Sequence, residues 1–200
     1  VAIAYSTSMT CQNLTPMMKD KLNNIIAEII LQGLDPADAK GLSTTTARKF
    51  VAARIGGVVS VFVLHAKEPK TAGGSRALAQ LMVRIGNSLP PPWVGMADTN
   101  IANLENSEVF VREVRDVTSQ NVVPEAHVDT SSKHRSLLHG QTYKTEKCLV
   151  TVKAPKDKMI CGGGALLADT KVLPDIEQGA TLPRPDWGSD HCLVAASLTL

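Results

Sequence analysis

The sequence is poor in several features that would assign it quickly to a class of protein. Phe, Trp and Tyr make up only 4% of the residues, and the charges nearly cancel, with 21 Lys and Arg against 19 Asp and Glu. A net charge of +2 does not predict nucleic-acid binding through the overall electrostatic field. Any function that involves a charged ligand is therefore expected to come from a local site.

Long apolar runs and paired cysteines are also missing. No window approaches the roughly 18 uninterrupted apolar residues of a membrane span, so no transmembrane segment is expected. None of the four cysteines forms a Cys-x-x-Cys pair, which argues against a structural zinc site. The N-terminus shows no secretory signal, but a mature secreted chain would look the same, so the compartment stays open.

The composition itself is that of a folded protein. Hydrophobic residues make up 44% of the 200 residues and charged residues 20%. A chain of this length buries a substantial core without dividing, so a single domain over residues 1–200 is expected.

Helical and strand patterns alternate along the chain. Apolar residues recur at helical spacing over 16–34 and again over 78–86, and a short helix is expected at Asn103–Arg115. Strands are expected at Val1–Ala4, Phe50–Ile55, Val58–Leu64, Trp93–Ala97, Leu149–Val152 and Cys192–Leu200, with Gly56-Gly57 turning a hairpin. Lys40–Thr46 and the basic cluster Lys153–Lys158 are interpreted as loops.

This alternation predicts an α/β fold. Because several strands are joined as hairpins, a strictly parallel wound sheet is disfavoured. The expected architecture is a layered sandwich of two mixed β-sheets flanked by helices.

Polar side chains stand at the ends of three predicted strands. His65 follows the strand Val58–Leu64 directly, and Asp98 and Asn100 follow the strand Trp93–Ala97. Asp190 and His191 directly precede the last strand. Strand ends place side chains at the rim of a sheet, where sites of layered α/β proteins commonly form. Histidines and aspartates are the groups that bind a hard cation and move protons in phosphodiester cleavage.

Three motifs in this order resemble the endonuclease/exonuclease/phosphatase (deoxyribonuclease I-like) superfamily. They are Val61-Phe62-Val63-Leu64-His65, then Val94-Gly95-Met96-Ala97-Asp98-Thr99-Asn100, and finally Trp187-Gly188-Ser189-Asp190-His191-Cys192-Leu193-Val194. The last is the most specific, because it fits the family's Ser-Asp-His-x-x-Val ending. The resemblance covers residues 50–200.

The resemblance implies a divalent-metal-dependent phosphodiesterase or nuclease-like hydrolase acting on nucleic acid or another phosphodiester. Asp98 would orient or activate the attacking water, and Asn100 would hold the phosphate. His191 would be the general base, Asp190 would support it or the metal, and His65 would stabilise or protonate the departing oxygen. Mg²⁺ is the implied cofactor, held weakly by Asp98 and Asp190.

The sequence also departs from the family. Tyr5-Ser6 stands where the family has a metal-site Asn, and Leu42-Ser43-Thr44 stands where it has Leu-Gln-Glu. The family's Asp-Tyr pair has only Glu146 as a poor substitute. Two explanations are open. The domain is a catalytically impaired relative that serves as a binding or structural module, with a partner protein, or the chain lacks an N-terminal part.

Overall fold

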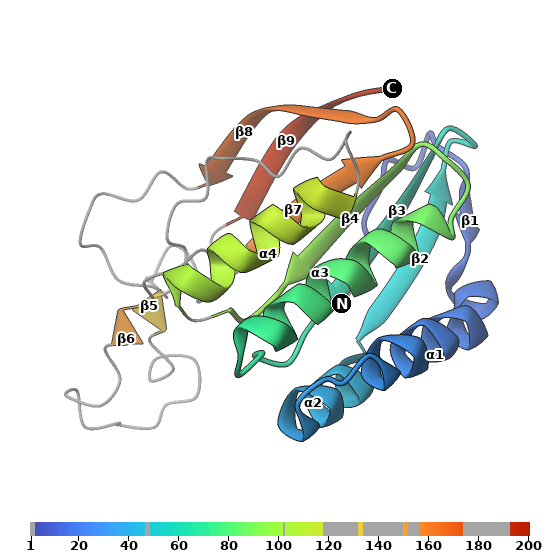
Figure 1. Cartoon of the computed structure of the whole chain (residues 1–200). Coiled ribbons are helices and arrows are strands. Elements are labelled where there is room, and N and C mark those ends of the chain that lie inside the picture. The colour runs from blue at the N-terminus through green and yellow to red at the C-terminus, as the bar shows by residue number, and fades with distance from the viewer. Residues whose placement is uncertain are drawn as a thin grey trace, which may run out of the picture.

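The computed structural model describes residues 3–46, 49–101, 103–117, 132–133, 150–151, 157–173 and 193–200. Its elements follow the chain in this order: β1 (Cys11–Asn13), α1 (Thr15–Leu31), α2 (Pro36–Thr46), β2 (Phe50–Ile55), β3 (Val59–His65), α3 (Ala72–Asn87), β4 (Trp93–Asp98), α4 (Leu104–Val117), β5 (Ser132–Lys133), β6 (Val150–Thr151), β7 (Asp157–Gly162), β8 (Leu166–Leu173) and β9 (Leu193–Thr199). Figure 1 labels them along the chain.

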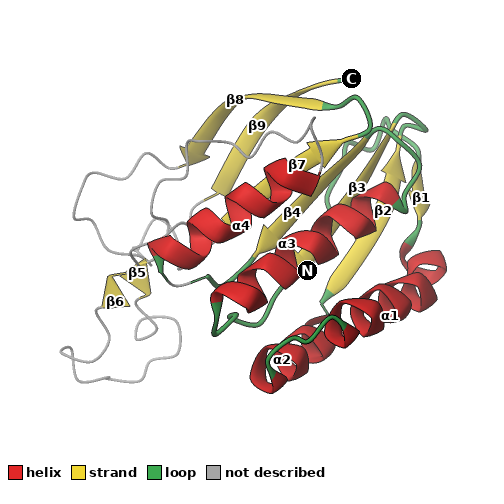
Figure 2. Cartoon of the chain, in the orientation of Figure 1, coloured by secondary structure: helices red, strands yellow, loops and turns green. Residues whose placement is uncertain are grey.

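A mixed five-stranded sheet forms the centre of the fold, with the strand order β1-β2-β3-β4-β7 (Figure 2). The pairs β1–β2, β2–β3 and β4–β7 are antiparallel, while β3 and β4 are parallel. Parallel neighbours need a crossover, and α3 supplies it between β3 and β4. The predicted α/β class with mixed strand directions is confirmed.

The hairpin of β2 and β3 follows from its two central glycines. Gly56 and Gly57 have φ values of 60° and 69°, a left-handed conformation that glycine adopts readily, and the Val58 N–H donates to the Ile55 carbonyl at 3.0 Å across the turn. Phe50 pairs with Leu64 and Ile55 with Val59, so the hairpin predicted around Gly56-Gly57 is confirmed.

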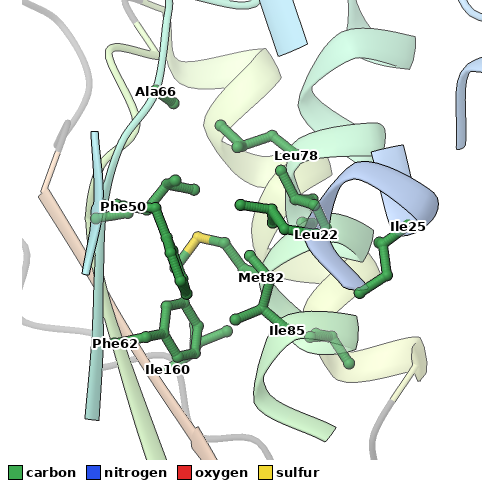
Figure 3. Close-up of a cluster of buried hydrophobic side chains, with 14 of the residues drawn as sticks. Leu22, Ile25, Phe50, Phe62, Ala66, Leu78, Met82, Ile85 and Ile160 are labelled. Atoms are coloured by element: carbon green, nitrogen blue, oxygen red, sulfur yellow. The ribbon is translucent and has the colours of Figure 1, made fainter. Parts of the chain in front are cut away.

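Helices cover one face of the sheet and enclose the main core. The apolar stripe of α1 is buried at Leu22 and Ile25, as its helical spacing predicts. Figure 3 shows Leu22 on the side of Met82 of α3, with the rings of Phe50 and Phe62 beyond them on the sheet. Burial on this scale stabilises the fold by about 1.5–3 kcal/mol for each large apolar side chain.

The opposite face of the sheet carries a smaller core. Val94 of β4 and Met159 and Cys161 of β7 pack there with Leu167 of β8, and Ala196 of β9 lies against them. The strands β8 and β9 pair antiparallel with each other. Where two mixed sheets were expected, the described residues therefore form one five-stranded mixed sheet, with the two-stranded pair β8–β9 against its second face, besides the short pair β5–β6.

Three predictions of local structure were wrong. Ile3 and Ala4 lie outside any strand, and the first described strand is β1. Lys40–Thr46, expected to be a loop, belongs to helix α2. The end of the basic cluster, Asp157-Lys158, begins strand β7. No helix in the described ranges is long and apolar enough to cross a membrane.

Candidate functional site

The parallel pairing of β3 and β4 brings the first two candidate side chains together. Both strands end at the same edge of the sheet, and His65 is the register partner of Asp98. Their side chains approach to 3.7 Å between Nε2 and Oδ2, with 39% and 20% of their surfaces exposed. An imidazole and a carboxylate at this distance form an ion pair whenever the imidazole carries a proton.

The loop after β4 is fixed by its own polar groups. The Asn100 N–H donates to Asp98 Oδ1 at 3.0 Å, and Asn100 adopts a left-handed backbone with φ 51°. Asparagine tolerates this conformation better than most residues do. The Asn100 Nδ2 donates to the Ala66 carbonyl at 2.9 Å, and the Ala66 N–H donates to the Asp98 carbonyl at 2.8 Å. Asn100 thus ties the segment after β3 to the segment after β4.

The amide of Asn100 has a structural contact besides the phosphate contact that was expected of it. A side-chain amide has two N–H donors and one acceptor oxygen, and the bond to Ala66 uses one donor. The hydrogen bonds of Asn100 to Asp98 and to the Ala66 carbonyl hold the loop in shape. A second contact with a phosphate stays a prediction.

The sequence reasoning missed a second carboxylate at the same edge. Asp157 begins β7 and is the register partner of Asp98 in the antiparallel ladder, so both carboxylates belong to one face of the sheet. Like charges directly opposite each other are destabilising, and a nearby cation relieves that repulsion. Asp157 was missed because it stands in a basic cluster that was interpreted as a loop. The signal that points to it is the apolar run Met159-Ile160-Cys161 that follows.

Lys158, next in the chain, points to the helix-covered face. It is 1% exposed, and its Nζ donates to Ser107 Oγ of α4 at 2.7 Å. Burial lowers the pKa of Lys158 to about 8, against a smaller opposing effect of the Asp157 charge. A lysine with so little exposed surface was not predicted for the basic cluster Lys153–Lys158.

Of the predicted site residues, the structure brings His65, Asp98 and Asn100 together at one rim. Asp190 and His191 lie outside the described residues. Thr44, the nearest counterpart of a metal-site Glu in a stretch expected to be a loop, lies on α2, and its Oγ1 donates to the Lys40 carbonyl at 2.9 Å. The loop predicted for Lys40–Thr46 was wrong because helix α2 occupies that stretch of the chain.

The described side chains at this rim supply only some of the ligands that a hard cation such as Mg²⁺ needs. Within the described ranges, no three His, Cys, Asp or Glu side chains form a group that could hold a metal ion. Asp98 and Asp157 supply carboxylate oxygens, which Mg²⁺ prefers, together with water. A weakly held Mg²⁺ at this rim stays a prediction, since Asp190, the other expected ligand, lies outside the described residues. Asp98 and Asp157 do not make a complete protein cage.

No protein-family model and no curated protein sequence matches this chain. Among solved structures, humanized D. rerio TDP2 carrying 14 mutations matches with a TM-score of 0.46 and 10% identity, over 76% of this chain and 60% of that one. D. rerio TDP2 complexed with single strand DNA product matches with a TM-score of 0.45 and 8% identity, over 76% and 60%.

A Bacteroides thetaiotaomicron mannosyl-6-phosphatase matches with a TM-score of 0.43 and 12% identity, over 76% of this chain and 56% of that one. The chain spans less than two thirds of the length of each of these structures. These scores describe a partial likeness of fold, and no residue role follows from them. Both kinds of protein belong to the endonuclease/exonuclease/phosphatase superfamily, which the sequence motifs resemble.

Proposed function

We propose that the chain hydrolyses phosphodiester bonds at the rim formed by His65, Asp98 and Asp157. The observation that supports this most directly is the pairing of His65 with Asp98 at 3.7 Å. An imidazole and a carboxylate beside a second carboxylate provide the acid–base groups for this chemistry and a site of negative charge for a cation.

The proposed reaction needs three tasks from the chain. Asp98 orients the attacking water, whose oxygen forms the new bond to phosphorus. His65 gives a proton to the departing oxygen as the old bond to phosphorus breaks. His191 is the proposed general base and Asp190 its support, as the Ser189-Asp190-His191 motif predicts. Positioned acids and bases of this kind contribute about 10²–10⁴-fold each to the rate.

Mg²⁺ is the proposed cofactor, and Asp98 and Asp190 are the residues proposed to hold it. Asp157, the partner of Asp98 in the β4–β7 ladder, would add a further carboxylate. A bound divalent cation would supply charge stabilisation at the phosphoryl oxygens. Asn100 is proposed to keep Asp98 in position through the N–H that donates to Asp98 Oδ1.

The substrate class is proposed as a nucleic acid or another phosphodiester. The near-neutral charge of the chain does not select between them. We also propose that β8–β9 is part of a second sheet, so that residues 1–200 form one sandwich-like domain. The apolar contacts of Leu167 and Ala196 with the central sheet support this arrangement.

The alternative function is a non-hydrolytic module of the same fold that binds a partner protein. The absence of a three-ligand metal group among the described residues favours it. The two functions separate in an assay of a generic aryl phosphodiester with and without Mg²⁺. Hydrolysis that depends on Mg²⁺ and is lost in His65→Ala supports the enzyme. No hydrolysis at millimolar Mg²⁺ supports the binding module.

A further inference from the structure

Helix α4 is fastened to the central sheet by a buried polar contact. Ser107 lies one turn into α4 and is 4% exposed, and its Oγ accepts the 2.7 Å hydrogen bond from Lys158 Nζ. The helix begins beside Asn103, whose Oδ1 accepts from the Asn106 N–H at 2.7 Å. The start of α4 is therefore held by its own cap and by a lysine from β7.

Lysine is an unfavourable residue at position 158 if its contact with Ser107 only attaches α4 to the sheet. Charged side chains are almost never fully buried, because removing an ammonium group from water is costly. The N-terminus of a helix also carries a partial positive charge, which disfavours a second positive charge nearby. An apolar side chain of the same length would attach α4 to the sheet without either cost. The use of Lys158 therefore points to a requirement for a specific position of Ser107.

The segment between β4 and α4 lies between two contacts with β7. At one end Asp98 pairs with Asp157, and at the other end Ser107 receives Lys158. Asn100 lies between these ends, and its N–H and amide group make the two bonds that shape the loop. Consecutive residues of a single strand thus hold both ends of the segment that presents Asp98 and Asn100.

We propose that Lys158 is a positioning residue that, through Ser107, sets the conformation of the loop carrying Asp98 and Asn100. Its effect on catalysis rests on the proposed function, whereas its effect on the loop does not. The side chain of Lys158 extends to the helix-covered face, away from the carboxylates, so it does not touch the substrate itself.

The loop conformation is tested by amide hydrogen exchange of the full chain. In Lys158→Met, which keeps the length of the side chain, the Asn100 N–H should exchange about tenfold faster, because its bond to Asp98 is then held less firmly. Ser107→Ala removes the other partner and should act at the same amide. Phe62 and Met82, in the core of β3 and α3, should keep their exchange rates. Ser75→Ala is the matched control, because Ser75 is also a buried helical serine but its Oγ has no hydrogen-bond partner.

Two outcomes overturn the proposal. In one, Lys158→Met leaves exchange at Asn100 unchanged while amides of α4 exchange faster, so the lysine only attaches the helix. In the other, exchange rises throughout β3 and α3 as well, so the lysine acts on global stability.

Catalysis gives a separate readout. If the chain hydrolyses an aryl phosphodiester, Lys158→Met should lower kcat by about tenfold with KM nearly unchanged, because a misplaced group acts on the transition state. A variant that folds more stably than the wild type and keeps full kcat would overturn the catalytic part. If the wild type hydrolyses nothing, the proposed function fails, and the exchange at Asn100 still decides whether Lys158 positions the loop.

Discussion

The carboxylate of Asp38 lies against Gly74 so closely that any side chain on residue 74 would overlap it. Asp38 is 4% exposed on α2 and accepts the Lys70 N–H and the Thr71 hydroxyl, each at 2.6 Å. Thr71 Oγ1 in turn accepts the Gly74 N–H at the start of α3. A carboxylate at a helix N-terminus is stabilised by the backbone N–H groups and the helix dipole, so this network joins α2 to α3.

This contact predicts opposite results for two neighbouring glycines. Gly74→Ala should lower the free energy of unfolding by about 1–3 kcal/mol, because a Cβ displaces the Asp38 carboxylate. Gly73→Ala is the control and should change it little or raise it slightly, since a Cβ there meets only Thr71 Oγ1 at 3.4 Å. Urea denaturation measures both. In the Asp38→Ala variant, Gly74→Ala should lower the free energy of unfolding by less than it does in the wild type. An equal loss in both proteins would contradict the overlap.

Lys158 predicts a dependence of stability on pH. Its pKa is lowered from 10.5 to about 8 in the folded chain. Below about pH 8 the folded and unfolded chains are both protonated at Lys158, and the whole cost of burying the ammonium is present. As the pH rises from about 8 to 10.5, the folded chain loses the proton first, so the cost is progressively removed.

The free energy of unfolding of the wild type should therefore rise relative to Lys158→Met by about 3 kcal/mol across this window, at about 1.4 kcal/mol for each pKa unit. Lys158→Met itself should be the more stable protein at neutral pH. Urea titrations at several pH values measure the difference. Parallel pH profiles for the two proteins would show that Lys158 keeps an ordinary pKa.

The proposed chemistry predicts separate effects for the two members of the His65–Asp98 pair. His65→Ala should lower the hydrolysis rate by about 10²–10⁴-fold while leaving the fold intact, because His65 is at a strand end and partly exposed. Asp98→Asn should lower the rate as well. It should also speed exchange of the Asn100 N–H, since the amide oxygen is a weaker acceptor. Lys19→Ala, on the exposed face of α1, is the control. Unchanged turnover in His65→Ala would remove His65 from the mechanism.

Mg²⁺ binding is predicted to be weak and to depend on the rim carboxylates. Calorimetric titration should give a dissociation constant in the millimolar range, about −4 kcal/mol of binding free energy. Asp98→Asn and Asp157→Asn should each weaken binding further, whereas Asp20→Asn on the exposed face of α1 should not. Tight binding by the wild type, or a loss equally large in Asp20→Asn, would contradict a site at the rim.

The elements that lead to the candidate site follow patterns that a sequence displays directly. The paired glycines at residues 56 and 57 determine the hairpin, and the apolar strands before His65 and Asp98 determine where those side chains stand. Helix α2 was missed because its residues Pro36–Thr46 lack an apolar stripe and its position depends on the contact of Asp38 with α3. Such a tertiary contact leaves no local pattern.

Strand β7 was missed for a different reason. Its second residue is Lys158, whose charge indicates a solvated position, and only the placement of Ser107 on a distant helix explains the burial. The carboxylate of Asp157 was missed for the same reason, although Asp157 is the partner of Asp98 in the β4–β7 ladder.

The parallel pairing of β3 with β4 also orders the events by which the chain can fold. The β2–β3 hairpin is local and forms within microseconds, but β3 cannot pair on its other side until α3 has crossed over. Until then β3 exposes an open edge rich in valine, of the kind that recruits other chains. A fragment that ends before Trp93 should therefore aggregate through β3, and a growing chain is most exposed to misassembly while α3 is being made.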